Sequence, residues 1–244
     1  MIAKPILEAV LAKAMSTGAD FAEIYVERTK ENNIVMIDSQ IDRIKDSLLS
    51  GVGIRIFKGL RCVNASTADL SLEGMLACAG RVADALGESN EEVSIHLTER
   101  LFGDIHPIRI VPDTALKSQK ADILKEAYFA AKEKSDRISQ VSATLLDVDH
   151  QILVANSDGL YAQDRQIRTR LAVEAVASKN GENQTGSCSP GRRMGLELFE
   201  MIPPRSIGEK AAAQALTMLD AAYCKAGTKT VAIENGFGGV IFHG

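Results

Sequence analysis

The feature that most constrains the fold is a long alternating run from Leu160 to Ala177. In its second half the residues at every other position are apolar or Thr, namely Ile167, Thr169, Leu171, Val173 and Ala175. The positions between them carry mostly charged residues, including Arg168, Arg170 and Glu174. A period of two places successive side chains on opposite faces of a strand. The run therefore predicts an antiparallel strand with one buried face and one face in water.

Four other segments have apolar residues at the helical period of 3.6. They span Ile6 to Met15, about Ser71 to Leu86, about Leu116 to Lys134, and a last segment from Ser206 to a stop at Gly227. Ser206 and Glu209 have the spacing of a capping box, which predicts that the last helix begins at Ser206. The apolar faces of all four helices are expected to lie in the core.

Strand-like runs lie between the helices of each pair, with turn-forming residues between the runs. The first set is Phe21 to Arg28, Asn33 to Asp38, Gly51 to Phe57 and Arg61 to Ala65; the second is Ile138 to Val148, Gln151 to Ala155 and Leu160 to Ala177. Uninterrupted alternation of strand and helix is missing, which argues against a doubly wound parallel sheet. We expect an α+β fold with two modules, each an antiparallel β-meander flanked by helices.

The stretch from Pro107 to Pro112 is the expected boundary between the two modules. The predicted domains are residues 1–105, residues 113–226 and a short third part, residues 227–244, which reads as the truncated start of a C-terminal domain. Val231 to Ile233 is expected to form a strand in that part. Glycines surround the apolar run Val240 to Phe242, so residues after about Gly227 are expected to be the least securely packed.

Composition excludes several classes of partner. A net charge of -4 without a basic cluster, and no Trp, argue against nucleic acid. No run approaches the roughly 18 apolar residues of a membrane span, and no secretory leader is visible. A cytoplasmic protein is expected, and its four cysteines, Cys62, Cys78, Cys188 and Cys224, lack metal-binding spacing and are expected to be buried thiols.

Few residues are candidates for chemistry. Cys188 lies near Arg192 and Arg193 in what reads as a mobile surface loop, with no His nearby to activate it. The glycine-rich stretch 236–239 lacks the spacing of a phosphate-binding loop, so a tight turn is expected there. His96, His106 and His150 are isolated in strand ends or turns, where solvated imidazoles are common. His243 differs, because it directly follows the apolar run.

Five pieces of the chain, in order, resemble the TldD/PmbA family of zinc metallopeptidases, and more specifically its TldD-type subunit. They are Gly18 to Tyr25, Arg43 to Asp46 followed by Gly51 to Arg55, Asn156 to Gly159, Gly195 to Phe199, and Gly227 to Val231 followed by Gly238 to His243. The last piece is similar to the lead-in to the family's HExxxH metal motif. Because the five pieces lie in register over most of the chain, we expect family membership.

The resemblance implies a cytoplasmic zinc peptidase that hydrolyses unfolded peptides and pairs with a PmbA/TldE-type subunit lacking the metal motif. His243 aligns with the first zinc ligand. Gly244 stands where the catalytic Glu belongs, and the second His lies beyond the sequence. In such a site two imidazoles hold the zinc and the Glu is the general base. We therefore predict no catalytic residue within the chain, which by itself is expected to be inactive.

A second hypothesis belongs to a different class of function. The chain would then be part of a non-catalytic PmbA/TldE-type partner subunit, or a peptide-binding module. The run Val240 to His243 favours the catalytic subunit, because partner subunits lack the histidine pair. A Glu and a second His encoded beyond residue 244 would distinguish the two.

Overall fold

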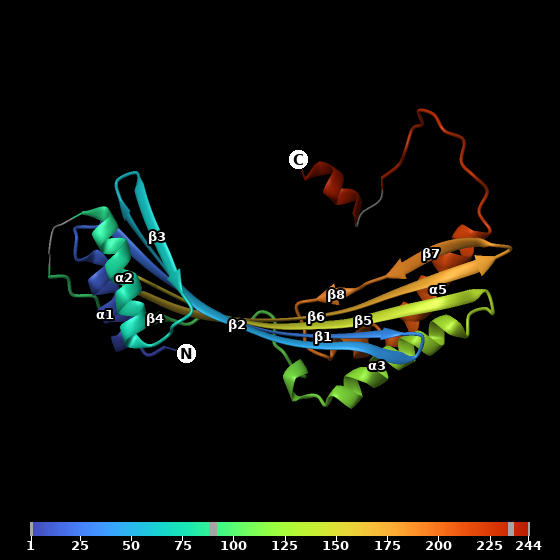
Figure 1. Cartoon of the computed structure of the whole chain (residues 1–244), viewed down its shortest axis with the longest axis horizontal. Coiled ribbons are helices and arrows are strands. Elements are labelled where there is room, and N and C mark those ends of the chain that lie inside the picture. Colours follow the sequence, from blue (N-terminus) through green and yellow to red (C-terminus); the bar gives the residue numbers. More distant parts are fainter. Residues whose placement is uncertain (1, 88–91, 234–236, 244) are drawn as a thin grey trace.

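The structure of the protein is a computed structural model that describes residues 2–87, 92–233 and 237–243. Its strands form one sheet in the order β3-β2-β1-β5-β6-β4, with β7 and β8 also pairing with β6 (Figure 1). The strands are β1 (Phe21–Ile37), β2 (Gln40–Lys58), β3 (Arg61–Thr67), β4 (Thr98–Arg100), β5 (Ile138–Asn156), β6 (Leu160–Lys179), β7 (Glu182–Cys188) and β8 (Gly191–Arg192). Neighbouring strands in the described ranges pair antiparallel, except that β4 pairs with β6 in parallel.

Two pairs of helices pack against this sheet, one pair near each end (Figure 1). The helices are α1 (Lys4–Met15), α2 (Leu72–Leu86), α3 (Lys117–Lys132), α4 (Leu198–Met201) and α5 (Pro204–Leu219), and two short 3₁₀ turns are η1 (Pro112–Thr114) and η2 (Phe237–Phe242). None of the helices in the described ranges is long and apolar enough to cross a membrane. The expected α+β class, with antiparallel strands and flanking helices, is confirmed.

The two helix pairs bury two separate hydrophobic clusters. α1 and α2 cover a cluster that includes Ile24 of β1, whereas α3 and α5 cover a second cluster that includes Ile34 of the same strand. Even-numbered residues of β1 contribute to both clusters, so both helix pairs lie on one face of the strand. The odd-numbered residues of β1, such as Tyr25, form part of the opposite face, here called the open face.

The strands of the two expected modules join into a single sheet, because β1 pairs with β5 from Glu23 to Ile37. Two isolated meanders would each leave an edge of unpaired backbone groups at this place. Pairing β1 with β5 removes both edges, and β1, β5 and β6 then contribute residues to both hydrophobic clusters, whereas β2 contributes only to the first. The helices themselves still divide as expected, with α1 and α2 before the stretch from Pro107 to Pro112 and α3 and α5 after it.

Several boundaries differ from the sequence-based expectation. Phe21 to Arg28 and Asn33 to Asp38 were expected as two strands, but Phe21–Ile37 forms the single strand β1. The turn expected at Asp149–His150, between two strand-like runs, lies inside β5. Residues 40–50 were not expected as a strand, and the structure buries none of their apolar residues. These residues form a strand because they pair with β1 along their length, with one irregularity between Val35 and Met36. The β2–β3 hairpin and the turns after β5 and β6 are as predicted.

The capping box predicted at Ser206 is wrong. α5 begins at Pro204, whose ring suits the first turn of a helix, and the Ser206 hydroxyl donates to the Pro203 carbonyl at 2.8 Å. The helix also ends at Leu219 and not at Gly227, because residues 221–227 are exposed and contribute nothing to the core. The second helix begins at Leu72, close to the expected start, and the Ser71 hydroxyl caps it by accepting from the Gly74 N–H.

Residues 221–233 and 237–243 contain little regular structure. Val231 to Ile233 is not a strand, because no other strand pairs with it among the described residues. The side chains of Val240, Ile241 and Phe242 are 66%, 69% and 76% exposed. The expectation that this apolar run is poorly packed is confirmed for the described part.

A buried carboxylate holds the segment before η1 against the segment before α4. Glu197 is 2% exposed and accepts backbone N–H bonds from Ile110 at 2.9 Å, Gly195 at 3.0 Å and Arg109 at 3.3 Å. Burial by itself would raise the pKa of Glu197, but these N–H donors outweigh it and hold the pKa below its ordinary value. The ionised side chain therefore stabilises the folded state.

Replacing Glu197 with Gln is expected to lower the free energy of unfolding by about 1–3 kcal/mol at pH 7, because an amide NH₂ then faces backbone donors. The pKa of Glu197 is lower in the folded state than in the unfolded state, where it is about 4.3. Ionised Glu197 therefore adds to the free energy of unfolding at pH values above about 4.3, and this contribution is lost as the pH falls through the folded pKa. The difference between wild type and variant, measured by urea denaturation, should therefore shrink from pH 7 toward pH 3. Glu200→Gln, on an exposed side chain that contacts Arg109, is the control. Equal losses in both variants would contradict the role of Glu197.

Candidate functional site

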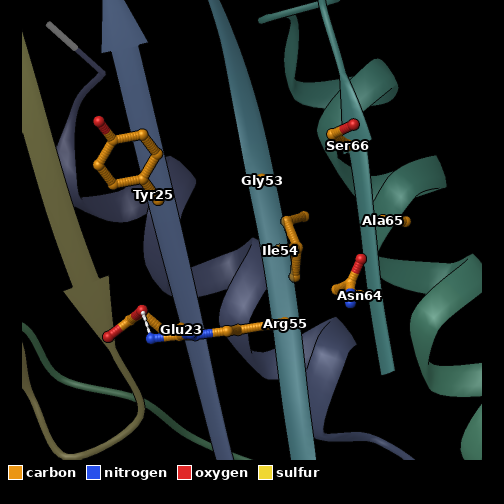
Figure 2. A pocket seen from close by; sticks show the side chains of 8 residues that line it. All are labelled: Glu23, Tyr25, Gly53, Ile54, Arg55, Asn64, Ala65 and Ser66. Atoms are coloured by element: carbon orange, nitrogen blue, oxygen red, sulfur yellow. Dashed lines mark ion pairs between the residues drawn. The ribbon is translucent and has the colours of Figure 1, made fainter. Parts of the chain in front are cut away.

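The open face carries a shallow hollow of about 300 Å³ over the strands β1, β2 and β3 (Figure 2). It is lined by Glu23, Tyr25, Gly53, Ile54, Arg55, Asn64, Ala65 and Ser66. Gly53 lies between Tyr25 and Ser66 in this view, and a Cβ added to it would meet no atom within 4 Å. The missing side chain of Gly53 therefore leaves the backbone of β2 open at the middle of the hollow.

The rim of the hollow is polar but electrically balanced. The Arg55 guanidinium lies 2.7 Å from the Glu23 carboxylate across the β1–β2 pair (Figure 2), and 5.7 Å from the centre of the Phe57 ring. Asn64 and Ser66 add neutral donors and acceptors from β3. This combination of open backbone, neutral polar groups and a paired charge suits a neutral, extended ligand better than an ionic one.

A hydrogen-bonded cluster borders the hollow on the same face. The Tyr25 hydroxyl donates to Glu27 Oε2 at 3.1 Å and lies 3.4 Å from His150 Nε2, while the Thr29 hydroxyl donates to Glu27 Oε1 at 2.7 Å. The Thr29 bond is the main cause that lowers the pKa of Glu27, and burial is the main cause that raises the pKa of Tyr25. At neutral pH the site therefore presents an un-ionised phenol and a carboxylate.

A second hollow of about 490 Å³ continues along the same strands and is also lined by Tyr25, Glu27, Gly51 and Gly53. Together the two hollows form a track beside the cluster of Tyr25, Glu27 and His150. No cysteine lines either hollow, and no group of three or more His, Cys, Asp and Glu residues in the described ranges has the geometry to hold a metal. The arrangement can bind a ligand by hydrogen bonds, but it lacks a metal centre.

His243, the residue expected as the first zinc ligand, lies far from this track in the chain. It is exposed after η2, and its backbone N–H donates to the Val240 carbonyl at 3.1 Å. Gly244 and Gly236 lie outside the described residues. The donor set of the described residues does not fit a zinc site, since His243 belongs to no group of three potential ligands. Its role as a metal ligand stays a prediction.

The cysteines are only partly as expected. Cys78 is buried, Cys188 is half-buried, and Cys62 and Cys224 are exposed, so the expectation of four buried thiols is wrong. Residues 186–193 are not a mobile loop, because β7 and β8 pair with β6 there. Burial raises the pKa of the Cys188 thiol, which opposes a role as nucleophile.

Tyr25, Glu27 and His150 were not identified as a cluster from the sequence. His150 was assigned to a turn, whereas it lies within β5 opposite Thr29 of β1. One signal was available, since Glu23, Tyr25 and Glu27 alternate with apolar residues and therefore share a strand face. The pairing of β1 with β5, which brings His150 to that face, has no local sequence signal.

Comparison with known proteins agrees with the resemblance in the sequence. Residues 22–86 match the family described as PmbA/TldA metallopeptidase domain 1, and residues 111–219 match the PmbA/TldA metallopeptidase central domain. The two matches together span more than half of the chain. They define the class of protein, which is a pair of adjoining metallopeptidase-family domains.

Curated relatives match over nearly the whole chain. A protein of Haemophilus influenzae named metalloprotease TldD homolog is 27% identical over 234 residues, covering 92% of this chain and 48% of the relative. A metalloprotease of Methanothermobacter thermautotrophicus is 22% identical over 229 residues, covering 92% of this chain and 49% of the relative. The chain therefore spans about half the length of the curated relatives it matches.

Solved structures share the fold. A Thermotoga maritima protein described as a candidate modulator of DNA gyrase superposes with a TM-score of 0.74 at 19% identity, over 92% of this chain and 50% of that one. TldE from Thermococcus kodakarensis gives a TM-score of 0.62 at 19% identity, over 86% and 47%. The chain belongs to the PmbA/TldD family.

Proposed function

We propose that this chain supplies the substrate-binding half of a TldD-type zinc metallopeptidase that hydrolyses unfolded peptides in the cytoplasm. One observation carries the proposal: relatives named as metalloproteases match 92% of this chain but only about half of their own length. A chain that corresponds to half of such an enzyme, and whose described residues hold no metal cluster, fits a role in binding and positioning substrate.

The track on the open face supports this role. It exposes the backbone of β2 at Gly51 and Gly53 and offers neutral polar groups from β3, which suit the main chain of an extended peptide. Recognition of the backbone is tolerant of side chains, as hydrolysis of varied unfolded peptides requires. The likeness to TldE supports a TldE-type partner subunit, because the catalytic and partner subunits of one family would share this fold.

The second candidate function is that of a metal-free PmbA/TldE-type partner subunit. The TM-score of 0.62 with TldE and the absence of a metal cluster among the described residues favour it. The curated relatives named TldD favour the catalytic subunit. The reading frame that contains residues 1–244 distinguishes the two, since a Glu and a second His after His243 are expected only in the catalytic subunit.

The metal content of the protein tests the proposed role of His243. The 244-residue chain, dialysed and analysed for metals, should hold far less than one zinc, because His243 supplies one of the usual three protein ligands. In the complete product of the reading frame, His243→Ala should lower zinc content and peptide hydrolysis by about 100-fold or more. His106→Ala, an exposed histidine, is the matched control. A stoichiometric, chelator-resistant zinc on the 244-residue chain would contradict the proposal.

A further inference from the structure

A second site, distinct from the track, lies on the open face beside β5, β6 and β8. It is a hollow of about 360 Å³ lined by Leu146, Val148, Arg168, Thr169, Arg170, Gly191, Arg192 and Arg193. Four of these eight residues are arginines and none is Asp or Glu. In a chain with a net charge of -4, such a concentration of positive charge requires a physical explanation.

Three of the four guanidiniums have no carboxylate partner among the ion pairs of the described residues. Arg168 donates to the amide oxygen of Gln166 at 2.7 Å, Arg170 to the hydroxyl of Ser189 at 3.0 Å, and Arg192 to the Gly191 carbonyl at 2.9 Å. These acceptors are all neutral. Only Arg193 contacts a carboxylate, that of Asp164 at 3.2 Å. The described residues therefore leave the positive charge of the hollow largely uncompensated.

The hollow also has an apolar floor and space for a ligand. Leu146 and Val148 of β5 lie directly opposite Arg170 and Arg168 and are partly exposed. Gly191 lies opposite Arg170, and a Cβ at that position would come within 3.2 Å of the Arg170 Cβ. The absence of a side chain at Gly191 leaves room for the guanidinium of Arg170 beside the strand edge.

The spacing of the arginines indicates the form of the ligand. Arg168 and Arg170 are two residues apart on one strand face, so their Cα atoms repeat at about 6.7 Å. An extended peptide presents alternate side chains with the same repeat, and Arg binds carboxylates through charge-assisted hydrogen bonds. A free phosphate has no such repeat. Glu31 of β1 lies two strands from Arg168, but the structure pairs it with neither guanidinium in the described ranges, since Arg168 and Arg170 donate to Gln166 and Ser189.

We propose that this hollow binds an acidic segment of a peptide, extended along β6, with carboxylates at alternate residues facing Arg168 and Arg170. The inference rests on the proposed function in taking a peptide as ligand, and it adds a preference for acidic sequence at a place outside the track. Binding is measured without any hydrolysis, so its failure is distinguishable from failure of the peptidase proposal.

The test is fluorescence anisotropy on the 244-residue chain with a labelled peptide in which Glu alternates with Ala. A second labelled peptide of the same length, with Gln in place of every Glu, is the uncharged comparison. We expect the acidic peptide to bind at least about 10-fold more tightly, and Arg168→Gln/Arg170→Gln to remove most of that difference. Raising the salt concentration from about 0.05 M to about 1 M should weaken binding of the acidic peptide only. Salt screens the attraction between exposed charges, and the screening length falls from about 10 Å at about 0.1 M to about 3 Å at about 1 M.

The matched control is Lys125→Gln/Arg205→Gln, which changes the net charge equally on exposed side chains of α3 and α5. It should bind the acidic peptide within about twofold of wild type, because α3 and α5 cover the opposite face of the sheet from the hollow. Three outcomes would overturn the proposal: equal binding of the acidic and neutral peptides, equal weakening in the control, or binding of oligothymidylate or inorganic phosphate as tight as that of the peptide. Circular dichroism of each variant verifies that it is folded.

Discussion

Replacing Lys120 with methionine is expected to lower the free energy of unfolding by about 3–5 kcal/mol. The Lys120 ammonium, on α3, lies 2.6 Å from Asp147 Oδ2 on β5 and 3.0 Å from Asn32 Oδ1 on β1. The side chains of Lys120 and Asp147 are only 4% and 10% exposed. Methionine fills a similar volume but leaves the Asp147 carboxylate buried without its counter-ion, which is the costly part of the change.

The effect should depend on pH, with a defined sign. Burial raises the pKa of Asp147 above its ordinary value, and the Lys120 ammonium only partly opposes this. The folded state therefore holds the Asp147 proton more tightly than the unfolded state does. As a result, Asp147 lowers the free energy of unfolding as the pH rises from its unfolded pKa to its folded pKa. Removing the ammonium raises the folded pKa further, so the deficit of Lys120→Met should be larger at pH 8 than at pH 5.

Urea denaturation followed by circular dichroism at both pH values measures this deficit. Lys125→Met is the control on the same helix, because its exposed contact with Asp122 at 3.4 Å contributes only about 0.5 kcal/mol or less. The double variant Lys120→Met/Asp147→Leu should recover most of the loss, since an apolar pair replaces both charges. A deficit below about 1 kcal/mol, or one that is the same at both pH values, would show that Asp147 does not need Lys120.

Gly208→Val is the second large change, and it is expected to cost about 3 kcal/mol or more. Gly208 lies in α5, where a Cβ would approach the Ala127 carbonyl oxygen of α3 to 2.0 Å and the Ala131 nitrogen to 3.2 Å. Both atoms are backbone, so no side-chain rotation can relieve the clash. The two helices would have to separate, which would open the second hydrophobic cluster.

Thermal unfolding measures this effect as a fall in Tm of about 6–12 °C for a chain of this size. Lys210→Val, on the exposed side of the same helix, is the control for the lower helix propensity of valine, and should cost about 0.7 kcal/mol or less. Gly208→Ala should lie between Gly208→Val and wild type. A Tm for Gly208→Val equal to that of Lys210→Val would show that α3 and α5 do not pack as closely as described.

The arginine hollow shows how far local pattern leads toward a site. Arg168 and Arg170 share the wet face of an alternating strand, and this face is visible in the sequence. Their lack of carboxylate partners depends on which strands lie beside β6, and Leu146, Val148 and Gly191 come from β5 and β8. Likewise, His150 joins Tyr25 only through the β1–β5 pairing. Neither constellation is predictable from periodicity.

By itself, the sequence determined the helices that cover the sheet, the long half-buried strand Leu160 to Ala177, the α+β class and the family. Each follows from short-range patterns of apolar residues and turns, or from motifs read in order. Only the tertiary structure decided that the two expected meanders form one sheet, that residues 40–50 are a strand, and which side chains meet on the open face. The reason is that strand pairing joins residues more than one hundred positions apart, as Tyr25 and Val154 are, and the backbone hydrogen bonds that join them carry no side-chain signature.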